Sequence, residues 1–273
     1  MKDRVKHFIK KHDCCGLINF IKHLKSIYVS FSAWQKAFWL KCRKNFSYIN
    51  RRRISNKYLE SHQVCKLQIG AGGNVLEGWL NTDFFPYARE IIVLDVTKPF
   101  PFANNVFDYI FCEHMIEHIT YNEGLKMLQE CQRVLKPGGK IRISTPNLQV
   151  HLNLFKGEKT QTQQQYMDWI SRNWLQRGGI AYDNAEFVLN LIMHGWGHKF
   201  VYDFKTISLA LVEVGFCDIL QAPCGVSDDV NLSGIERHGD TIKDIKGIEK
   251  KSGSAIDNEM NNFATLVAEA VKR

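Results

Sequence analysis

Short apolar runs alternate with polar, glycine-containing and proline-containing connections between residues 64 and 145. Runs of this kind are typical of buried parallel strands. They are KLQI (66–69), WLNTD (79–83), IIVLDV (91–96), YIFC (109–112) and KIRIST (140–145). Between the last two, apolar spacing predicts a helix from Tyr121 to Leu135 that stops at the PGG of residues 137–139. Strands alternating with helices or loops predict an α/β fold with a doubly wound parallel sheet, which binds ligands at the carboxyl ends of its strands.

A helical pattern precedes this region. From Gly16 to about Phe46, apolar residues recur every three or four positions with lysines between them, which predicts an amphipathic helix. The longest uncharged stretch there, residues 26–35, is far shorter than the roughly 20 residues that cross a bilayer. Two interpretations stay open: a basic helix on an anionic membrane surface, or an arm docked on its own domain or a partner's. We therefore expect a basic amphipathic helical arm, residues 1–62, and a catalytic domain, residues 63–273.

The distribution of charge also distinguishes the arm from the domain, and the cysteine content bears on the cellular compartment. The chain of 273 residues has a formal net charge of +8, but residues 1–60 alone carry +12, so the rest is acidic by −4. The arginine cluster at residues 51–53 suits phosphates of lipid or RNA, or is a solvated charged face. The eight cysteines form no CxxC pair, which is typical of reduced thiols in a cytoplasmic protein. We expect a cytoplasmic protein whose only membrane association would be peripheral, through residues 1–53.

The glycine turn after the first strand is the first candidate for chemistry. Gly70, Gly72 and Gly73 allow positive φ and close approach of a ligand to the backbone. Asp83, at the end of the second strand, can accept hydrogen bonds from ribose hydroxyls. The missing third glycine of GxGxxG and the short spacing to Asp83 argue against a dinucleotide site. The turn by itself could equally be a plain strand connection, but Asp95 and Glu113 also fall at strand ends, which favours a nucleoside-containing cofactor.

Five segments in order resemble the class I S-adenosylmethionine-dependent methyltransferases. They are LQIGAGG, WLNTD, LDVTKPFPF, NNVFDYIFCEHMIEH and LQECQRVLKPGGKIRISTPN, between about Leu67 and Leu148. More narrowly, the GWxNxD turn and the late HGWGHKFVYD, His194 to Asp203, resemble predicted methyltransferases associated with cell-surface polysaccharide biosynthesis. The resemblance implies a Rossmann-like sheet of seven strands with the last strand antiparallel, to which FCDIL and FATLVAEAVKR supply the final two strands. It also implies S-adenosyl-L-methionine as the cofactor.

The resemblance further assigns residues to the cofactor. These are Gly70, Ala71, Gly72, Asp83, Asp95, Val96, Cys112 and Glu113. Asp83 would bind the ribose hydroxyls, Asp95 with Val96 would lie beside adenine, and the segment from Cys112 to His114 would pass near the sulfonium. Two departures from the family pattern are Gln68, where an acidic residue is common, and a short connection between the first two strands.

The same resemblance places His114 at the mouth of the site. A sulfonium is already an activated methyl donor, so positioning supplies much of the rate, and a hydroxyl acceptor also needs a base. Histidine suits that role because its ordinary pKa lies near neutrality. Glu117 and His118 follow one turn later and would act with His114, or would stabilise the loop and cap the next helix. The run also spells HxxEH, the inverted zinc-protease motif, but its methyltransferase context leads us to expect no metal.

Residues 149–200 interrupt the alternating pattern and are expected to form a lid over the acceptor site, or a variable insertion packed on the sheet. His194 and His198, which follow, are interpreted as acceptor contacts or structural residues. The glycines between them argue against a helix that would align them as metal ligands. Asp203 precedes FKTISLALVEVGF and is predicted to cap a helix that Gly215 ends.

Together these observations favour a methyltransferase acting on an oxygen or nitrogen of a small acceptor, with a glycan or lipid-linked acceptor as the finer hypothesis. An RNA methyltransferase, prompted by the basic arm, is less favoured because the fourth strand ends in CEHM without the Asn or Asp and two prolines of amino-methylating nucleic-acid enzymes. Nucleic acid is thus not the expected partner. A non-catalytic methyltransferase-like binding protein is the third alternative.

Overall fold

The structure is a computed structural model that describes residues 38–39, 41–181, 184–236, 241–243, 249–251 and 255–273. The chain divides into two compact units, Met1–Phe46 and Ser47–Arg273. In the first unit, the described residues 38–39 and 41–46 are helical. The expected amphipathic pattern before Phe38 lies outside the described residues, and membrane association through it stays a prediction. Among the described helices, none has the length and apolar character needed to cross a bilayer.

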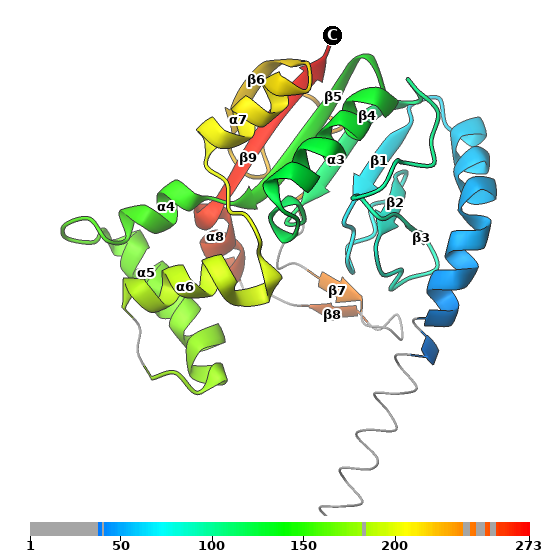
Figure 1. The fold of residues 1–273 in the computed structure, drawn as a ribbon. Coiled ribbons are helices and arrows are strands. Elements are labelled where there is room, and N and C mark those ends of the chain that lie inside the picture. The colour runs from blue at the N-terminus through cyan, green and yellow to red at the C-terminus, as the bar shows by residue number, and fades with distance from the viewer. Residues whose placement is uncertain (1–37, 40, 182–183, 237–240, 244–248, 252–254) are drawn as a thin grey trace, which may run out of the picture. The chain divides into compact units, whose positions relative to one another are not determined.

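The second unit is built on a seven-stranded sheet with the order β3-β2-β1-β4-β5-β9-β6 (Figure 1). The strands are β1 (Lys66–Ile69), β2 (Leu80–Asp83), β3 (Ile91–Val93), β4 (Phe107–Glu113), β5 (Leu135–Pro146), β6 (Phe216–Ala222) and β9 (Thr265–Lys272). The first five are parallel, and β9 runs antiparallel to both neighbours. The predicted doubly wound sheet with an antiparallel last strand is confirmed. A separate pair, β7 (Thr241–Lys243) and β8 (Glu249–Lys251), forms a two-stranded sheet.

The strand register brings the functional ends of the strands to one edge. Ile69 at the end of β1 pairs with Thr82 of β2 and with Cys112 of β4. On the other side of β4, the end of β5 pairs with the start of β9, Pro146 opposite Thr265. Parallel strands must place their carboxyl ends together, and an antiparallel neighbour contributes its amino end to the same edge.

Helices α3 (Tyr121–Val134) and α7 (Phe204–Glu213) pack side by side on one face of the sheet (Figure 1). A capping box at Thr120 starts α3, and the carboxylate of Asp203 accepts the backbone N–H of Thr206 to start α7, as predicted. Their buried faces join the strands in the main hydrophobic core. The α3 helix ends at Val134, three residues before Pro137, because β5 begins at Leu135; its pairing with β4 shifts register between Leu135 and Lys140, across the PGG turn.

The opposite face has a smaller apolar cluster around Trp79, Phe111 and Leu232. Beside it, the guanidinium of Arg142 is fully buried and ion-paired with Glu236, at 2.5 Å, and with Glu269. The residues between β1 and β2 form turns and contain no helix, which agrees with the short connection noted in the sequence.

Helical residues 47–61 belong to the second unit, although the arm was expected to extend to residue 62. The Oγ of Ser47 accepts the backbone N–H of Val93 at 2.9 Å, and the buried Tyr58 hydroxyl contacts the carbonyls of Lys66 and Gly78. This part of the helix is therefore docked on its own domain, because its polar side chains complete hydrogen bonds of the sheet and its connections.

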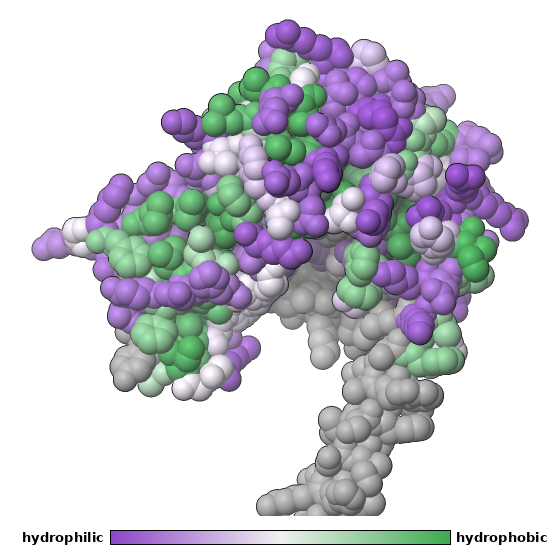
Figure 2. Space-filling view, viewed as in Figure 1, coloured by the Kyte–Doolittle hydropathy of each residue, from purple (hydrophilic) through white to green (hydrophobic). Residues whose placement is uncertain are grey.

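A helical layer occupies residues 148–197, where a lid was expected. Its elements are α4 (Leu148–Asn153), α5 (Gln161–Ile170), η2 (Ser171–Leu175), η3 (Gln176–Gly178), α6 (Ala185–His194) and η4 (Gly195–Gly197). With α8 (Ala255–Ala264) it buries a second core around Tyr166, Ile170, Val188 and Met260. Figure 2 shows hydrophobic residues gathered between hydrophilic ones on the outer face of this layer. Because this layer has its own hydrophobic core, its packing can hold a binding surface at the edge of the sheet without relying on the main core.

We expect Gly215→Ala to lower the free energy of unfolding by about 1 kcal/mol, because Gly215 ends α7 with a left-handed φ of 96°. A Cβ there would meet only Gln132, at an ordinary 3.7 Å, so the backbone conformation is the cause. Urea denaturation measures the effect. Gly178→Ala is the control, since its Cβ would enter open space and its φ is not left-handed. Equal effects of the two substitutions would contradict this explanation.

Candidate active site

The glycine turn and Asp83 form one hydrogen-bonded unit at the edge of the sheet. The N–H of Gly72 donates to Oδ2 of Asp83 at 2.8 Å, and the N–H of Phe85 donates to Oδ1 at 2.8 Å. Burial raises the pKa of Asp83, while these N–H groups act in the opposite direction. Gly72 has a φ of 54°, and a Cβ there would point into open space. A carboxylate fixed by two backbone donors keeps lone pairs for further donors, so the pair Gly72 and Asp83 fits a ribose diol.

The neighbouring residues expected to contact the cofactor lie at the same edge, and each is held there by different contacts. A Cβ on Gly70 would come within 2.6 Å of Met115, so the β4 exit itself requires glycine there. Ala71 is buried, and its N–H donates to the carbonyl of Thr82 at 2.9 Å. Asp95, two residues beyond β3, accepts the N–H and hydroxyl of Thr97 through Oδ1. Its carboxylate therefore shapes the loop beside the expected adenine position.

Val96 is half-buried beside Asp95, and the end of β4 completes the set. Cys112 is fully buried in the main core, and burial raises the pKa of its thiol, so it stays neutral and acts by packing. Glu113 is the last residue of β4 and is also buried. Contact of these residues with the cofactor stays a prediction.

A cavity of about 210 Å³ lies next to the exits of β4 and β5. Residues from the sheet edge, the helical layer and the HGWGHK segment line it, among them His114, Glu117, His118, His151, Tyr166, Trp169, Trp174, Trp196, His198, Asn261 and Thr265. Trp169, Trp174 and Trp196 form a chain of ring contacts with centroids 5.9 and 5.6 Å apart. The cavity therefore combines aromatic faces on its lid side with imidazoles and a carboxylate on its sheet side, as binding pockets for polar ligands do.

His114 leaves β4 in a strained conformation. Its φ of 42° lies in the left-handed region, which is costly for a residue with a Cβ. Nε2 lies 3.3 Å from Oγ1 of Thr265, and because that hydroxyl donates to the carbonyl of Asn261, it can only accept from the ring. Nδ1 lies 3.2 Å from Oε1 of Glu117. Burial disfavours the imidazolium, but Glu117 and Glu113 outweigh it and raise the pKa of His114. Nε2 is therefore occupied and Nδ1 lies against the carboxylate of Glu117, which makes His114 a positioning group.

Glu117 joins three parts of the site. Its carboxylate is fully buried, and Oε2 accepts the hydroxyl of Thr145 at 3.0 Å. Oε1 approaches His114 but accepts no properly directed hydrogen bond from any described residue. Although burial by itself raises it, the His114 ring holds the pKa of Glu117 below its ordinary range. Its backbone carbonyl accepts the N–H groups of Lys199 and Phe200 at 2.7 and 3.2 Å, which fixes the HGWGHK segment against the β4 exit.

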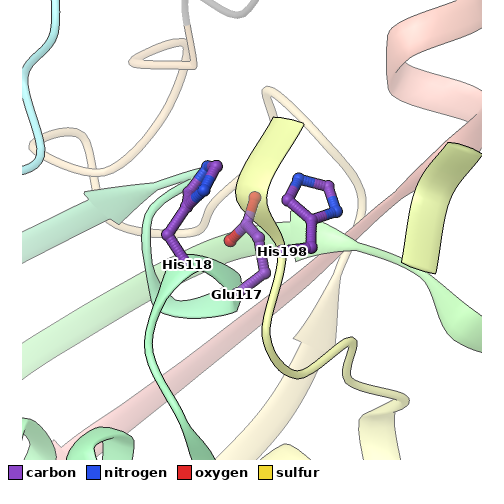
Figure 3. A group of neighbouring side chains, drawn as sticks. All are labelled: Glu117, His118 and His198. Atoms are coloured by element: carbon purple, nitrogen blue, oxygen red, sulfur yellow. The ribbon is translucent and has the colours of Figure 1, made fainter. Parts of the chain in front are cut away.

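This connection places His198 beside His118. Their ring centroids are 4.9 Å apart, and Figure 3 shows the carboxylate of Glu117 between the two rings. Nδ1 of His198 donates to the carbonyl of Ile192 at 2.6 Å, which leaves Nε2 as an acceptor. Burial lowers the pKa of His198 and favours its neutral form.

His194, in contrast, does not join this cluster. It is the exposed last residue of α6 and does not line the cavity. Gly195–Gly197 forms a short turn with Trp196 at a left-handed φ of 50°, so no helix aligns His194 with His198. The argument from the intervening glycines is thus confirmed.

Residues that the sequence analysis missed come from the helical layer and β9. His151 of α4 is fully buried, with Nδ1 2.7 Å from the carbonyl of Asn147 and Nε2 2.8 Å from the hydroxyl of Tyr166. Thr265 begins β9 and reaches His114. Neither lies in a recognisable motif. Their only sequence signal is a polar residue within an apolar segment, which does not indicate what it contacts.

Residues 74–143 match the family model for a methyltransferase domain. That domain supports S-adenosyl-L-methionine as the cofactor. The match spans β2 to β5, the part of the sheet that carries Asp83, Glu113 and His114. No curated protein matches the chain.

Several solved structures are similar to the chain. A methyltransferase from Thermotoga maritima, titled a possible histamine N-methyltransferase, is 13% identical with a TM-score of 0.41, and the match covers 91% of this chain and 99% of that one. A methyltransferase from Mesorhizobium loti is 14% identical with a TM-score of 0.44, covering 81% and 97%. The CurJ carbon methyltransferase is 13% identical with a TM-score of 0.40, covering 78% of this chain, which spans about half (49%) of that one. These distant likenesses carry no conclusion about the acceptor.

We expect His151 to make folding stability depend on pH. Burial lowers the pKa of His151 to about 4 from an ordinary value of 6.5. The unfolded chain therefore takes up a proton that the folded chain refuses as the pH falls from about 6.5 towards 4, which costs the fold about 3 kcal/mol by pH 4. His151→Gln, which retains a donor for the Asn147 carbonyl, should remove that part of the decline. Urea denaturation of both proteins between pH 7 and pH 4 measures the difference. Parallel stability curves would show that His151 titrates normally.

Proposed function

We propose that this protein transfers the methyl group of S-adenosyl-L-methionine to an oxygen or nitrogen of a small acceptor held in the cavity beneath the helical layer. The observation that supports this proposal most is that the Gly72 and Asp83 unit and the cavity lie at the same edge of the sheet. The Gly72 and Asp83 unit lies at the ends of β1 and β2, and the cavity begins at the ends of β4 and β5. The segment from Glu113 to His118 connects the two, so one segment can contact both a cofactor and an acceptor.

At the glycine turn, the task of the protein would be to bind and orient S-adenosyl-L-methionine. Asp83 would accept hydrogen bonds from the ribose hydroxyls, Gly70 to Gly72 would allow the methionine part to approach the backbone, and Asp95 with Val96 would border adenine. Bound S-adenosyl-L-methionine supplies an activated methyl group, so the main task of the chain is alignment of the acceptor. The match of residues 74–143 to a methyltransferase domain supports this assignment.

On the acceptor side, Glu117, His118 and His198 would contact the reacting group. All three line the cavity, and their functional atoms lie close together. A hydroxyl acceptor must lose its proton, and a carboxylate or a neutral imidazole within hydrogen-bond reach can take it. His114 would position Glu117 and border the methyl group. The strained backbone at His114 supports a functional role, because such conformations cluster at active sites.

The finer proposal is a glycan or lipid-linked sugar as the acceptor. Trp169, Trp174 and Trp196 offer apolar ring faces, and the opposite wall offers a carboxylate and imidazoles. A sugar ring has apolar faces bordered by hydroxyl groups, so it can stack on an indole while its hydroxyls bond to polar side chains.

Isothermal titration calorimetry with S-adenosylhomocysteine tests the cofactor half. The wild type should bind one equivalent, and Asp83→Asn should weaken binding at least tenfold, because an amide loses the charge and one acceptor oxygen that the ribose hydroxyls need. Glu90→Gln is the matched control, since this exposed acid lies on the loop before β3. If the wild type fails to bind, the proposed function is wrong. If both variants bind equally well, Asp83 is not the ribose ligand.

Radiolabelled methyl transfer tests the acceptor half. Incubation of the protein and labelled cofactor with separated glycan, lipid and RNA fractions should label the glycan or glycolipid fraction. Trp196→Ala should reduce that labelling at least fivefold through a higher KM, because the exposed indole forms part of the stacking surface. Its affinity for S-adenosylhomocysteine should not change. Label confined to RNA would overturn the acceptor proposal while leaving the cofactor proposal intact.

A further inference from the structure

The cluster of Glu117, His118 and His198 has the composition of a metal site. One ligand atom from each residue lies within 4.8 Å of the other two. Two imidazoles and one carboxylate form the usual protein ligand set of catalytic zinc sites and of several other divalent transition metals. The sequence did not indicate this set of three residues. A metal site read from the HxxEH motif would include His114, and one read from HGWGH would include His194.

The buried carboxylate provides an independent indication. Glu117 is fully buried and lines the cavity, and its Oε1 accepts no hydrogen bond from the described residues. A buried carboxylate oxygen without a directed donor is costly, and nearby cations or coordinated metals are the usual compensation. His114 is close at 3.2 Å, but it is out of line for a hydrogen bond. Oε1 therefore lacks a hydrogen-bond donor at the wall of the cavity that Glu117 lines.

The hydrogen bond of His198 has the form expected of a metal ligand. Its Nδ1 donates to the carbonyl of Ile192 at 2.6 Å, which fixes the tautomer and leaves the lone pair on Nε2. Metal-bound histidines commonly donate their second nitrogen to a backbone carbonyl in this way, which orients the ring and increases its basicity. The other two ligand candidates sit in the short turn Ile116–His118, whose backbone carries the hydrogen bonds from Lys199 and Phe200. The two ligand-bearing segments are thus fixed to each other before any ion binds.

We propose that Glu117, His118 and His198 bind one divalent transition-metal ion, such as zinc(II), in the wall of the cavity. Ligand atoms about 2.0–2.1 Å from one ion lie roughly 3.4 Å apart in a tetrahedron, so the cluster needs a side-chain adjustment of about 1 Å. Three protein ligands leave at least one position open, as in catalytic sites. An oxygen of the acceptor can complete the coordination at the cavity wall, and the ion would then replace these three side chains as the group that promotes its deprotonation; that last step rests on the proposed function.

Titration of the tag-free, chelator-treated protein with zinc(II), followed by calorimetry, tests the site. We expect one equivalent to bind with micromolar affinity or better, and His118→Ala and His198→Gln each to weaken it at least tenfold. His194→Ala is the matched control, because this histidine lies only four residues before His198 but is exposed and outside the cavity. It should leave the affinity unchanged. The absence of stoichiometric binding, or equal losses in His194→Ala and His198→Gln, would overturn the proposal.

Cobalt(II) provides a second measurement that reports the ligand type. Its absorption spectrum should show the bands of a four- or five-coordinate nitrogen and oxygen site, and His198→Gln should abolish them. A thiolate charge-transfer band would place the ion on cysteine and refute the site. S-adenosylhomocysteine affinity, measured on the same metal-free samples, separates the two proposals. Cofactor binding without metal binding refutes only the metal site, whereas metal binding without cofactor binding refutes only the proposed function.

Discussion

The active-site region depends on one buried residue at the exit of β4. The carboxylate of Glu117 contacts Thr145 at the end of β5 and the ring of His114, while its carbonyl accepts two N–H groups from Lys199 and Phe200. The turn at Glu117 and the segment at Lys199 and Phe200, about 80 residues later in the chain, are thereby fixed to each other. A buried polar group is stabilising only when its partners are in place, so the hydrogen bonds of Glu117 couple the shape of the cavity to the integrity of the sheet edge.

Backbone strain is found on both sides of this cavity. His114 and Trp196 adopt left-handed φ values of 42° and 50°, although neither is glycine. Such conformations persist where surrounding contacts over-determine them. At His114 these contacts include the N–H bond to the carbonyl of Ser144, at 2.9 Å, and the interactions of the ring with Glu117 and Thr265. At Trp196 they include the indole contacts with Trp174 and His198. Both rings are directed into the cavity by backbone geometry that the fold must support.

The domain separates the two tasks of a transferase between two sets of elements. β1 and β2 carry the glycine turn and Asp83 at their ends, and Leu67, Ile69 and Leu80 of these strands belong to the main core. The helical layer has a second core of its own and supplies the aromatic side of the cavity. Because the two cores are distinct, the proposed function predicts that changes in the helical layer alter acceptor selectivity without disturbing cofactor binding. The segment between Glu113 and His118 is the exception, since under the proposed function it contacts both ligands.

The sequence by itself determined the sheet and the cofactor edge. Apolar strands, the glycine turn, the cap at Asp203 and the stop at Gly215 are local signals, and each reflects a conformational preference within a few residues. The last parallel strand, expected from Lys140, begins earlier at Leu135, because Leu135 already pairs with Phe107 of β4 before the register shifts across the PGG turn. Local reasoning also could not find Thr265 or His151, whose partners lie on other elements.

Tertiary structure alone decided which histidines lie together. His114, His118, His194 and His198 looked like two local pairs, but the turn Gly195–Gly197 removes His194 from the cavity, and the carbonyl of Glu117 brings His198 to His118. The physical reason is that spacing along a chain predicts proximity only within a regular element. Contacts across a turn with positive φ, and contacts between segments 80 residues apart, depend on hydrogen bonds that form only when the sheet is assembled.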